Sequence, residues 1–264
     1  MIVAGIDISS ISAKAIIKNA HEILSSKLLP TLPGSIETAW QVVQEVLQAT
    51  SLSMDDVEYT VSTGYGRVNV PFAQANITEI SCHAKGTHTI FPEVRTILDM
   101  GGQDCKVIKC NEKSKVIDFV MNDKCAAGTG RYLEKVAEVW ELSLDQIGPL
   151  SLQTVEGAVD IDSYCVVFAE TDIIALLRQG THMNDILAGA HEALTRRIKS
   201  LVDRVGMSGD FSISGGIAKN IGIVNRLERD LNLTAHIASD PQMVGAFGAA
   251  MFAQERLAKQ MAAS

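Results

Sequence analysis

Apolar positions along the first hundred residues alternate between short continuous runs and a helical spacing. The short runs fit β-strands at 1–8, 13–17, 57–61 and 95–99. Apolar residues recur at i, i+3, i+4, i+7 and i+8 over 35–48, which predicts an amphipathic helix, and a second helix is expected over 78–90. Strands that alternate with helices in this way predict an α/β fold.

The second half of the chain repeats this order. Strand-like runs at 105–110 and 116–121 follow a glycine turn, GGQD, and are joined by the turn NEKSK. We expect the remaining elements in the order of a long helix (184–205), a strand (211–214), the segment SGGIAKN, a further helix, a short strand (235–237) and a terminal helix from Pro241.

Two segments share one order of parts: a strand with an aspartate near its end, a tight turn of small residues, and a second strand. They are GIDISSISAK at 5–14 and DMGGQDCK at 99–106. This pattern predicts an internal duplication. Because no low-complexity linker separates the copies, we expect packed halves with a hinge near residue 92. The halves would be 1–92, completed by the C-terminal helix 245–264, and 93–244.

The two aspartates that precede these turns, Asp7 and Asp99, suit a nucleotide site. A hairpin turn without bulky side chains can present backbone N–H groups to phosphate, and an adjacent aspartate can hold Mg²⁺ through water. Either aspartate alone is better explained as a turn-capping residue. Two such turns followed by SGGIAKN favour the nucleotide interpretation.

This order of motifs resembles the superfold of acetate and sugar kinases, actin and heat-shock ATPases, in which two ribonuclease-H-like halves clamp ATP. The resemblance implies that Asp7 organises Mg²⁺ and that Gln103 positions water. It implies γ-phosphate contacts from Ser10, Ser12 and Lys14. Further residues implied for ATP or ADP binding are Asp99, Gly101, Gly102, Asp104, Gly215, Gly216, Ala218, Lys219, Asn220 and Gln242. The first loop departs from the superfold pattern, which usually has glycine at Ser9 and threonine at Ile11.

Charge and composition narrow the classes of partner. The 23 basic and 31 acidic residues give a net charge of −8, and no basic run relieves it, so nucleic acid and anionic membranes are not expected partners. The opening MIVAGIDISS has no basic residue before its apolar run, and no apolar stretch approaches 18 residues. We therefore expect a cytoplasmic protein.

Five cysteines are an odd number in a chain of this length, so a disulfide framework is not expected. Cys125 and Cys165 each precede an expected helix start. Helix N-termini carry partial positive charge, which stabilises thiolates and an anionic iron–sulfur cluster. The alternative is burial as small apolar side chains. The other cysteines fit that alternative, and the neighbouring histidines lack compact metal-site spacing. These residues are Cys82, Cys105, Cys110, His83 and His88.

The sequence MNDKCAAGTGR, followed about forty residues later by CVVFAE, resembles the activator family of 2-hydroxyacyl-CoA dehydratases and benzoyl-CoA reductases. STGYGR, ISCHAKG, DMGGQD and SGGIAKN extend the resemblance over nearly the whole chain. It implies a homodimeric ATPase with one [4Fe–4S] cluster, held by Cys125 and Cys165 of both subunits, since such a cluster takes four thiolates.

The resemblance also implies a role in electron transfer. Single low-potential electrons would come from a ferredoxin or flavodoxin and would pass to an iron–sulfur dehydratase, a reductase or a double-cubane cluster protein. A sugar kinase of the same superfold is the alternative, although it would have no use for Cys125 and Cys165. A chaperone or scaffold would need a peptide-binding domain, for which this length leaves no room.

Overall fold

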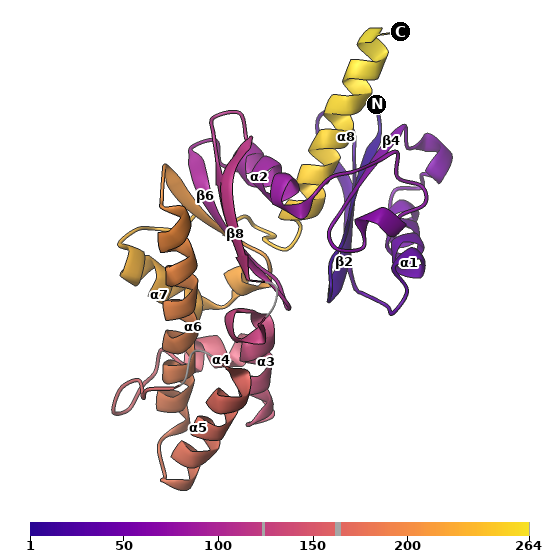
Figure 1. Ribbon diagram of the computed structural model, residues 1–264. Helices are drawn as coiled ribbons and strands as arrows, with labels where there is room; N and C mark the ends of the chain where they lie inside the picture. Colours follow the sequence, from indigo (N-terminus) through magenta and orange to yellow (C-terminus); the bar gives the residue numbers. More distant parts are fainter. Residues whose placement is uncertain (123–124, 162–164, 264) are drawn as a thin grey trace. The chain divides into compact units, whose positions relative to one another are not determined.

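The computed structural model describes residues 1–122, 125–161 and 165–263 and divides into two compact units (Figure 1). Residues 1–93, 110–117 and 238–264 form the first unit, and residues 94–109 and 118–237 form the second. The chain therefore leaves the first unit near residue 93, returns briefly at 110–117, and returns again for its last helix.

The sheet of the first unit has the strand order β3-β2-β1-β4-β5. Strand β1 pairs antiparallel with β2 and parallel with β4. Its strands are β1 (Val3–Ile8), β2 (Ser12–Lys18), β3 (Ile23–Pro30), β4 (Tyr59–Thr63) and β5 (Ala75–Asn76). Strand β3 was not expected. It lies at the edge of the sheet, where most of its side chains are exposed, so its sequence lacks the continuous apolar run of a buried strand.

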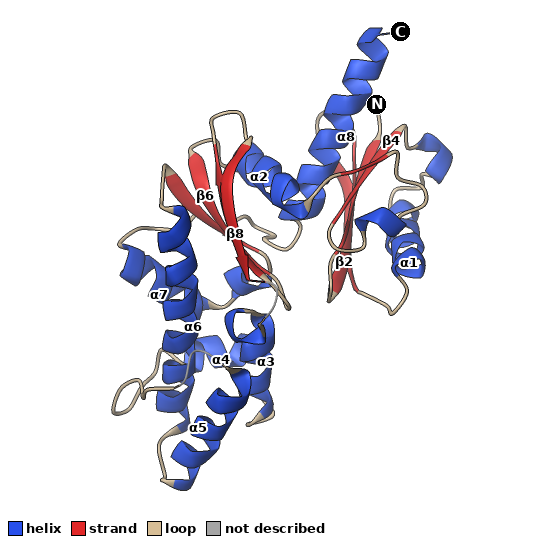
Figure 2. Ribbon diagram, viewed as in Figure 1, coloured by secondary structure: helices blue, strands red, loops and turns tan. Residues whose placement is uncertain are grey.

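Helices cover both faces of this sheet (Figure 2). Helix α1 (Ser35–Gln48) packs against β1, β2 and β3, and α8 (Val244–Ala263) packs against β1, β2 and β4. Helix α2 (Glu79–Ile90) lies along α8. Because β1 is buried on both faces, its residues are apolar almost without interruption. Two 3₁₀ turns, η1 (Met54–Asp56) and η2 (Arg67–Asn69), complete the unit.

The second unit has a related sheet with the order β8-β7-β6-β9. Its strands are β6 (Val94–Met100), β7 (Cys105–Cys110), β8 (Val116–Asn122) and β9 (Asp210–Ser214). The strand expected at 235–237 is a single parallel bridge between Ser212 and His236. His236 makes two backbone hydrogen bonds, of 2.9 and 3.1 Å, beside β9, which is too little to form a strand.

Helix α6 (Met183–Val205) runs through the second unit, and four other α-helices of the described part of the unit pack against it. They are α3 (Gly130–Glu138), α4 (Leu144–Leu150), α5 (Val166–Arg178) and α7 (Ile221–Leu231). The short turns η3 (Ala126–Gly128) and η4 (Gly216–Lys219) precede α3 and α7. One apolar core joins these helices to β6, β7 and β9.

Most expected elements agree with the structure. Helix α1 and strand β7 have the expected bounds, whereas β4 begins two residues later than expected and α8 begins at Val244 instead of Pro241. A turn closed by a 3.2 Å hydrogen bond from Met243 N to Asp240 O precedes α8 and delays its start. In the described part of the chain, no helix is both long and apolar enough to span a membrane.

Candidate active site

The β1–β2 hairpin places an aspartate opposite a lysine at the first unit's tight turn. Asp7 and Lys14 are register partners, with exposed fractions of 2% and 6%. Lys14 Nζ lies 3.2 Å from Asp7 Oδ2 and donates to the carbonyl oxygen of Ser12 at 3.2 Å. A buried charge is costly unless it is paired, so this ion pair is what allows Asp7 to remain inside the unit.

Ser9 stands where the superfold usually has glycine, and its side chain supports this ion pair. Ser9 Oγ donates to Asp7 Oδ1 at 2.8 Å and accepts from Lys14 Nζ at 3.0 Å. A 3.2 Å hydrogen bond from Ser9 N to Ser12 O closes the turn. Gly64, which follows β4, has a φ of +84°, and a Cβ there would overlap Asp7 Oδ1. Glycine is therefore required at this position.

The β6–β7 hairpin of the second unit repeats this arrangement. Asp99 and Lys106 are register partners, and Lys106 Nζ lies 3.4 Å from Asp99 Oδ2 and 2.7 Å from Asp104 Oδ2. Ser214 Oγ donates to Asp99 Oδ1 at 3.1 Å. All three charged residues are buried, so two carboxylates share one ammonium group.

The duplication includes the glycine that follows the neighbouring parallel strand. Gly215 has a φ of +80°, and a Cβ there would lie 2.5 Å from Met100 O and 2.9 Å from Asp99 Oδ1. It therefore corresponds to Gly64, which stands in the same relation to Asp7. STGYGR and SGGIAKN are thus the same structural element in the two units.

Sequence reasoning missed Lys106, although the signal was present. In both hairpins a lysine follows the aspartate by seven residues, and a four-residue turn lies between them. The sequence analysis gave a role to Lys14 alone. The structure places Lys106 in the same register position, with 3% of its surface exposed.

The other expected nucleotide-binding residues are divided between the two units. Ser10 helps to line an open pocket of about 490 Å³, which also includes Thr31, Ser35 and Tyr65. Gly101, Gly102 and the exposed Gln103 form the β6–β7 turn. Gly216, Ala218 and Lys219 form η4, and the half-buried Gln242 precedes α8 in the first unit.

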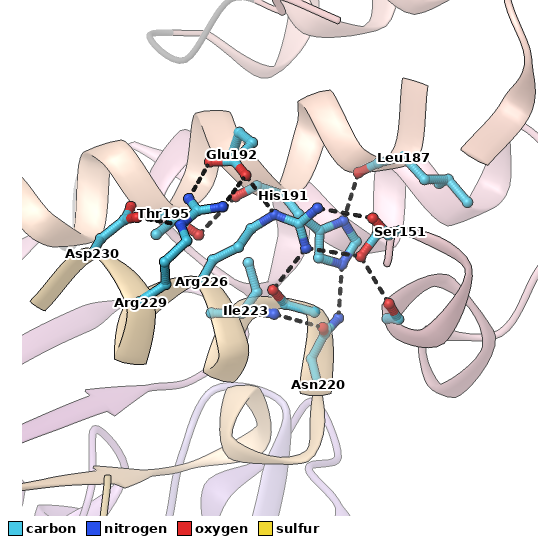
Figure 3. A network of polar contacts seen from close by, with 12 residues as sticks. Ser151, Leu187, His191, Glu192, Thr195, Asn220, Ile223, Arg226, Arg229 and Asp230 are labelled. Atoms are coloured by element: carbon cyan, nitrogen blue, oxygen red, sulfur yellow. Dashed lines mark hydrogen bonds and ion pairs between the residues drawn. The ribbon is translucent and has the colours of Figure 1, made fainter. Parts of the chain in front are cut away.

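Asn220 ends the glycine segment and belongs to a buried polar network (Figure 3). Its Oδ1 accepts from Ile223 N at 3.1 Å and so caps α7, and its Nδ2 lies 3.2 Å from His191 Nε2. His191 Nδ1 lies 2.7 Å from the carbonyl oxygen of Leu187. Because a carbonyl only accepts, Nδ1 carries the proton and Nε2 accepts from Asn220. Burial lowers the pKa of His191 to about 4, so the ring is neutral.

Arg226 extends this network to α4 (Figure 3). The guanidinium donates to the carbonyl oxygens of Ser151 and Gly222, both at 2.8 Å. Glu192 on α6 accepts from Arg226 at 3.0 Å and from Arg229 at 2.9 Å. The end of the glycine segment is therefore held between α4, α6 and α7.

Both cysteines singled out in the sequence lie at helix starts in the second unit. Cys125 directly precedes η3, and Cys165 is the N-cap residue of α5. Each is half-buried and has an extended backbone, and α3 packs against α5. The flanking residues 123–124 and 162–164 of these two motifs lie outside the described residues.

The remaining cysteines are buried in the cores, with at most 1% of their surface exposed. Burial raises the pKa of Cys82 to about 12 and also raises that of Cys105. Both are therefore protonated thiols at neutral pH and poor metal ligands. Cys110 is similarly buried. Among the described residues of this single chain, no three His, Cys, Asp or Glu side chains gather in a way that could hold a metal ion.

Two main-chain hydrogen bonds join the β6–β7 turn to the helix that follows Cys125. Gly130 N donates to Gly101 O at 3.0 Å, and Arg131 N donates to Gly102 O at 2.9 Å. The first N–H groups of a helix have no partner within it, and here the turn supplies the acceptors. A Cβ on Gly130 would lie 3.0 Å from Gly101 O, so the turn and the helix start are in close contact.

This architecture is the α/β fold of the actin and sugar-kinase superfold. The structure aligns with a ROK family glucokinase from Streptomyces griseus with a TM-score of 0.59, over 97% of this chain and all of that chain. The sequence identity is 13%, so this likeness concerns the fold alone. The two hairpins, one in each unit, are the elements that the resemblance to this superfold led us to expect.

The chain belongs to the BadF/BadG/BcrA/BcrD ATPase family, whose model matches residues 4–253. It is 41% identical over 261 residues to the activator of lactoyl-CoA dehydratase from Anaerotignum propionicum, covering 98% of this chain and all of that one. It aligns with a TM-score of 0.94 and 38% identity with the ADPNP-bound activator of 2-hydroxyisocaproyl-CoA dehydratase from Clostridium difficile. That alignment covers 100% of this chain and 98% of the other. The protein is therefore an ATPase, and the sugar-kinase alternative is not favoured.

The neutral, buried imidazole of His191 predicts a pH-dependent contribution to stability. Its folded pKa of about 4 lies below the ordinary value of 6.5, so the unfolded chain binds the proton first as the pH falls. The contribution is fully present above pH 6.5 and is lost between pH 6.5 and 4, by about 2 kcal/mol at pH 5. Urea unfolding at pH 7 and pH 5 measures it in the wild type and in His191→Gln. The difference in unfolding free energy between them should shrink by this amount.

The exposed His21 provides the matched control, as His21→Gln removes an imidazole without disturbing the buried network. A difference between wild type and His191→Gln that is the same at both pH values would contradict the neutral, buried state assigned to His191.

Proposed function

We propose that this ATPase delivers single, low-potential electrons to an iron–sulfur partner enzyme. The observation that carries the proposal is the pair of hydrogen bonds between the β6–β7 turn and the start of α3, the helix that follows Cys125. These bonds connect a candidate phosphate-binding turn to the start of the helix that follows a candidate cluster ligand.

The donor set fits one [4Fe–4S] cluster shared by two copies of the chain. Such a cluster takes four thiolates, and Cys125 and Cys165 supply two. A two-fold axis through the cluster would bring the same two residues from the second subunit. Cys125 directly precedes the turn η3 and Cys165 is the N-cap residue of α5, and neither has the deep burial of Cys82 or Cys105. When bound, the cluster would supply one-electron chemistry.

The two hairpins would bind the phosphates of Mg²⁺-ATP. We assign the Mg²⁺ water shell to Asp7, with the Lys14 ammonium beside it for the γ-phosphate. Ser10 and Ser12 supply further donors from the same turn. Gln103, exposed on the other turn, would orient the attacking water. Asp99 and Asp104, buried beside the Lys106 ammonium, would take part in nucleotide binding from that hairpin.

Loss of the γ-phosphate would alter the β6–β7 turn, and Gly101 and Gly102 would pass the change to α3 through their carbonyl groups. A change of state driven by nucleotide requires that ATP and ADP bind the two states with different affinity. The hydrogen bonds between the turn and α3 join main-chain groups only, so no flexible side chain lies between them to absorb the movement.

The partner class follows from the family. Because the chain resembles a dehydratase activator over its whole length, we propose a 2-hydroxyacyl-CoA dehydratase, a benzoyl-CoA reductase or a double-cubane cluster protein as electron acceptor. A ferredoxin or flavodoxin would be the donor. The active form would be a cytoplasmic homodimer, and the acyl-CoA substrate would bind to the partner.

Cysteine substitutions test the cluster. Cys125→Ser and Cys165→Ser should each abolish the brown colour and the iron content of anaerobically purified protein, because each removes two of the four ligands in the dimer. Cys105→Ala and Cys110→Ala are the matched controls and should retain about four irons per dimer. Iron and sulfide analysis measures the result. A full iron content in Cys125→Ser would rule out this ligand set.

Two further substitutions test ATP hydrolysis. Asp7→Asn and Gln103→Ala should each slow ATP turnover by ~10²-fold or more, since each removes a group assigned to position a reactant. Both variants should still carry iron, because neither residue is proposed as a cluster ligand. Steady-state phosphate release measures the rates. Wild-type turnover in Gln103→Ala would remove this glutamine from the mechanism.

A further inference from the structure

The Asp7 carboxylate is enclosed by elements from three parts of the first unit. Lys14 and Ser9 contact it from its own hairpin. Gly64 approaches Oδ1 from the end of β4, where a Cβ would overlap that oxygen. Gly245 approaches from the start of α8, and a Cβ there would lie 3.3 Å from Oδ2. The backbone thus comes as near to this carboxylate as glycine permits.

His83 lies on the same side of the carboxylate as Gly245. A Cβ on Gly245 would lie 3.3 Å from Asp7 Oδ2 and only 2.8 Å from His83 Nε2. The imidazole nitrogen and the carboxylate oxygen therefore flank a glycine that has no side chain to separate them. The distance between His83 Nε2 and Asp7 Oδ2 can therefore be spanned by a direct hydrogen bond or by one bridging water.

Rigid packing between two helices holds His83 in this place. Helix α2 approaches α8 so closely that a Cβ on Gly248 would overlap the carbonyl oxygen of Cys82, the residue before His83. A Cβ on Gly86 would likewise overlap the carbonyl oxygen of Val244. His83 is 6% exposed, so its ring is directed inward, toward Asp7. The position of the His83 backbone is therefore set by close contact between the two helices.

We infer that His83 is a positioning residue for Asp7, with Nε2 holding Oδ2 or a water bound to it in the orientation that Mg²⁺ requires. Groups that bond to a metal site's carboxylates from outside typically affect metal affinity or activity by 10- to 100-fold. The inference rests on the proposed role of Asp7 in Mg²⁺ binding. A merely structural histidine at this position would affect stability and leave the Mg²⁺ requirement unchanged.

The experiment measures the Mg²⁺ concentration that gives half-maximal binding of a fluorescent, non-hydrolysable ATP analogue, together with kcat for ATP hydrolysis. His83→Phe keeps the ring volume without a hydrogen-bonding nitrogen and should raise this Mg²⁺ concentration about 10-fold. His83→Gln, whose amide can donate, should recover most of the loss. His88→Ala, on the same helix, is the matched control and should match the wild type. Should His83→Phe fail to fold, His83→Leu gives the same reading.

Asp7→Asn, alone and combined with His83→Phe, separates this inference from the proposed function. If His83 acts through Asp7, the double variant should be no worse than Asp7→Asn alone. An altered Mg²⁺ requirement in Asp7→Asn with a wild-type requirement in His83→Phe would overturn the role of His83 and leave that of Asp7. A wild-type requirement in Asp7→Asn would overturn the Mg²⁺ assignment itself.

Discussion

A buried ion pair across each tight hairpin is the constraint on which both units are built. In the first unit it joins Asp7 to Lys14, and in the second it joins Asp99 to Lys106. Removing one member of a buried pair leaves an uncompensated charge and typically costs about 3–5 kcal/mol. The pair therefore fixes the register of each hairpin, and with it the four-residue turn that presents backbone N–H groups. Ser9 and Ser214 complete the shell of the two aspartates from different places in the chain.

The second turn has a further function in the fold, because the start of α3 depends on it. The first N–H groups of α3 have no acceptor within the helix, and they donate to the carbonyl groups of Gly101 and Gly102 instead. The same helix follows Cys125. A movement of this turn must therefore move α3 or break two hydrogen bonds. Breaking them would cost about 1 kcal/mol each. In this account, ATP turnover is connected to the cysteine element through this contact.

Local pattern was sufficient to predict the hairpins, because apolar runs and small turn residues are read directly from neighbouring positions. It was also sufficient for α1, whose apolar spacing is regular. It was not sufficient for β3, which is exposed at an edge, or for α4, which is short. Lys106 was missed although its spacing from Asp99 repeats that of Lys14 from Asp7. The equivalence of Gly64 and Gly215 became visible only from the contact each makes with a distant aspartate. The same holds for Asn220 and His191, and for the contact of Gly130 with Gly101, since these partners are brought together by folding alone.

We propose that the nucleotide at the turn controls access to a cluster held by Cys125 and Cys165. The most direct measurement is the rate at which iron is lost to a chelator under anaerobic conditions, with the dimer saturated either with ADP or with a non-hydrolysable ATP analogue. Docking to an electron acceptor needs a short transfer distance, so the account predicts faster loss with the ATP analogue. Equal rates in the two nucleotide states would contradict it, even if the cluster and the ATPase activity were both present.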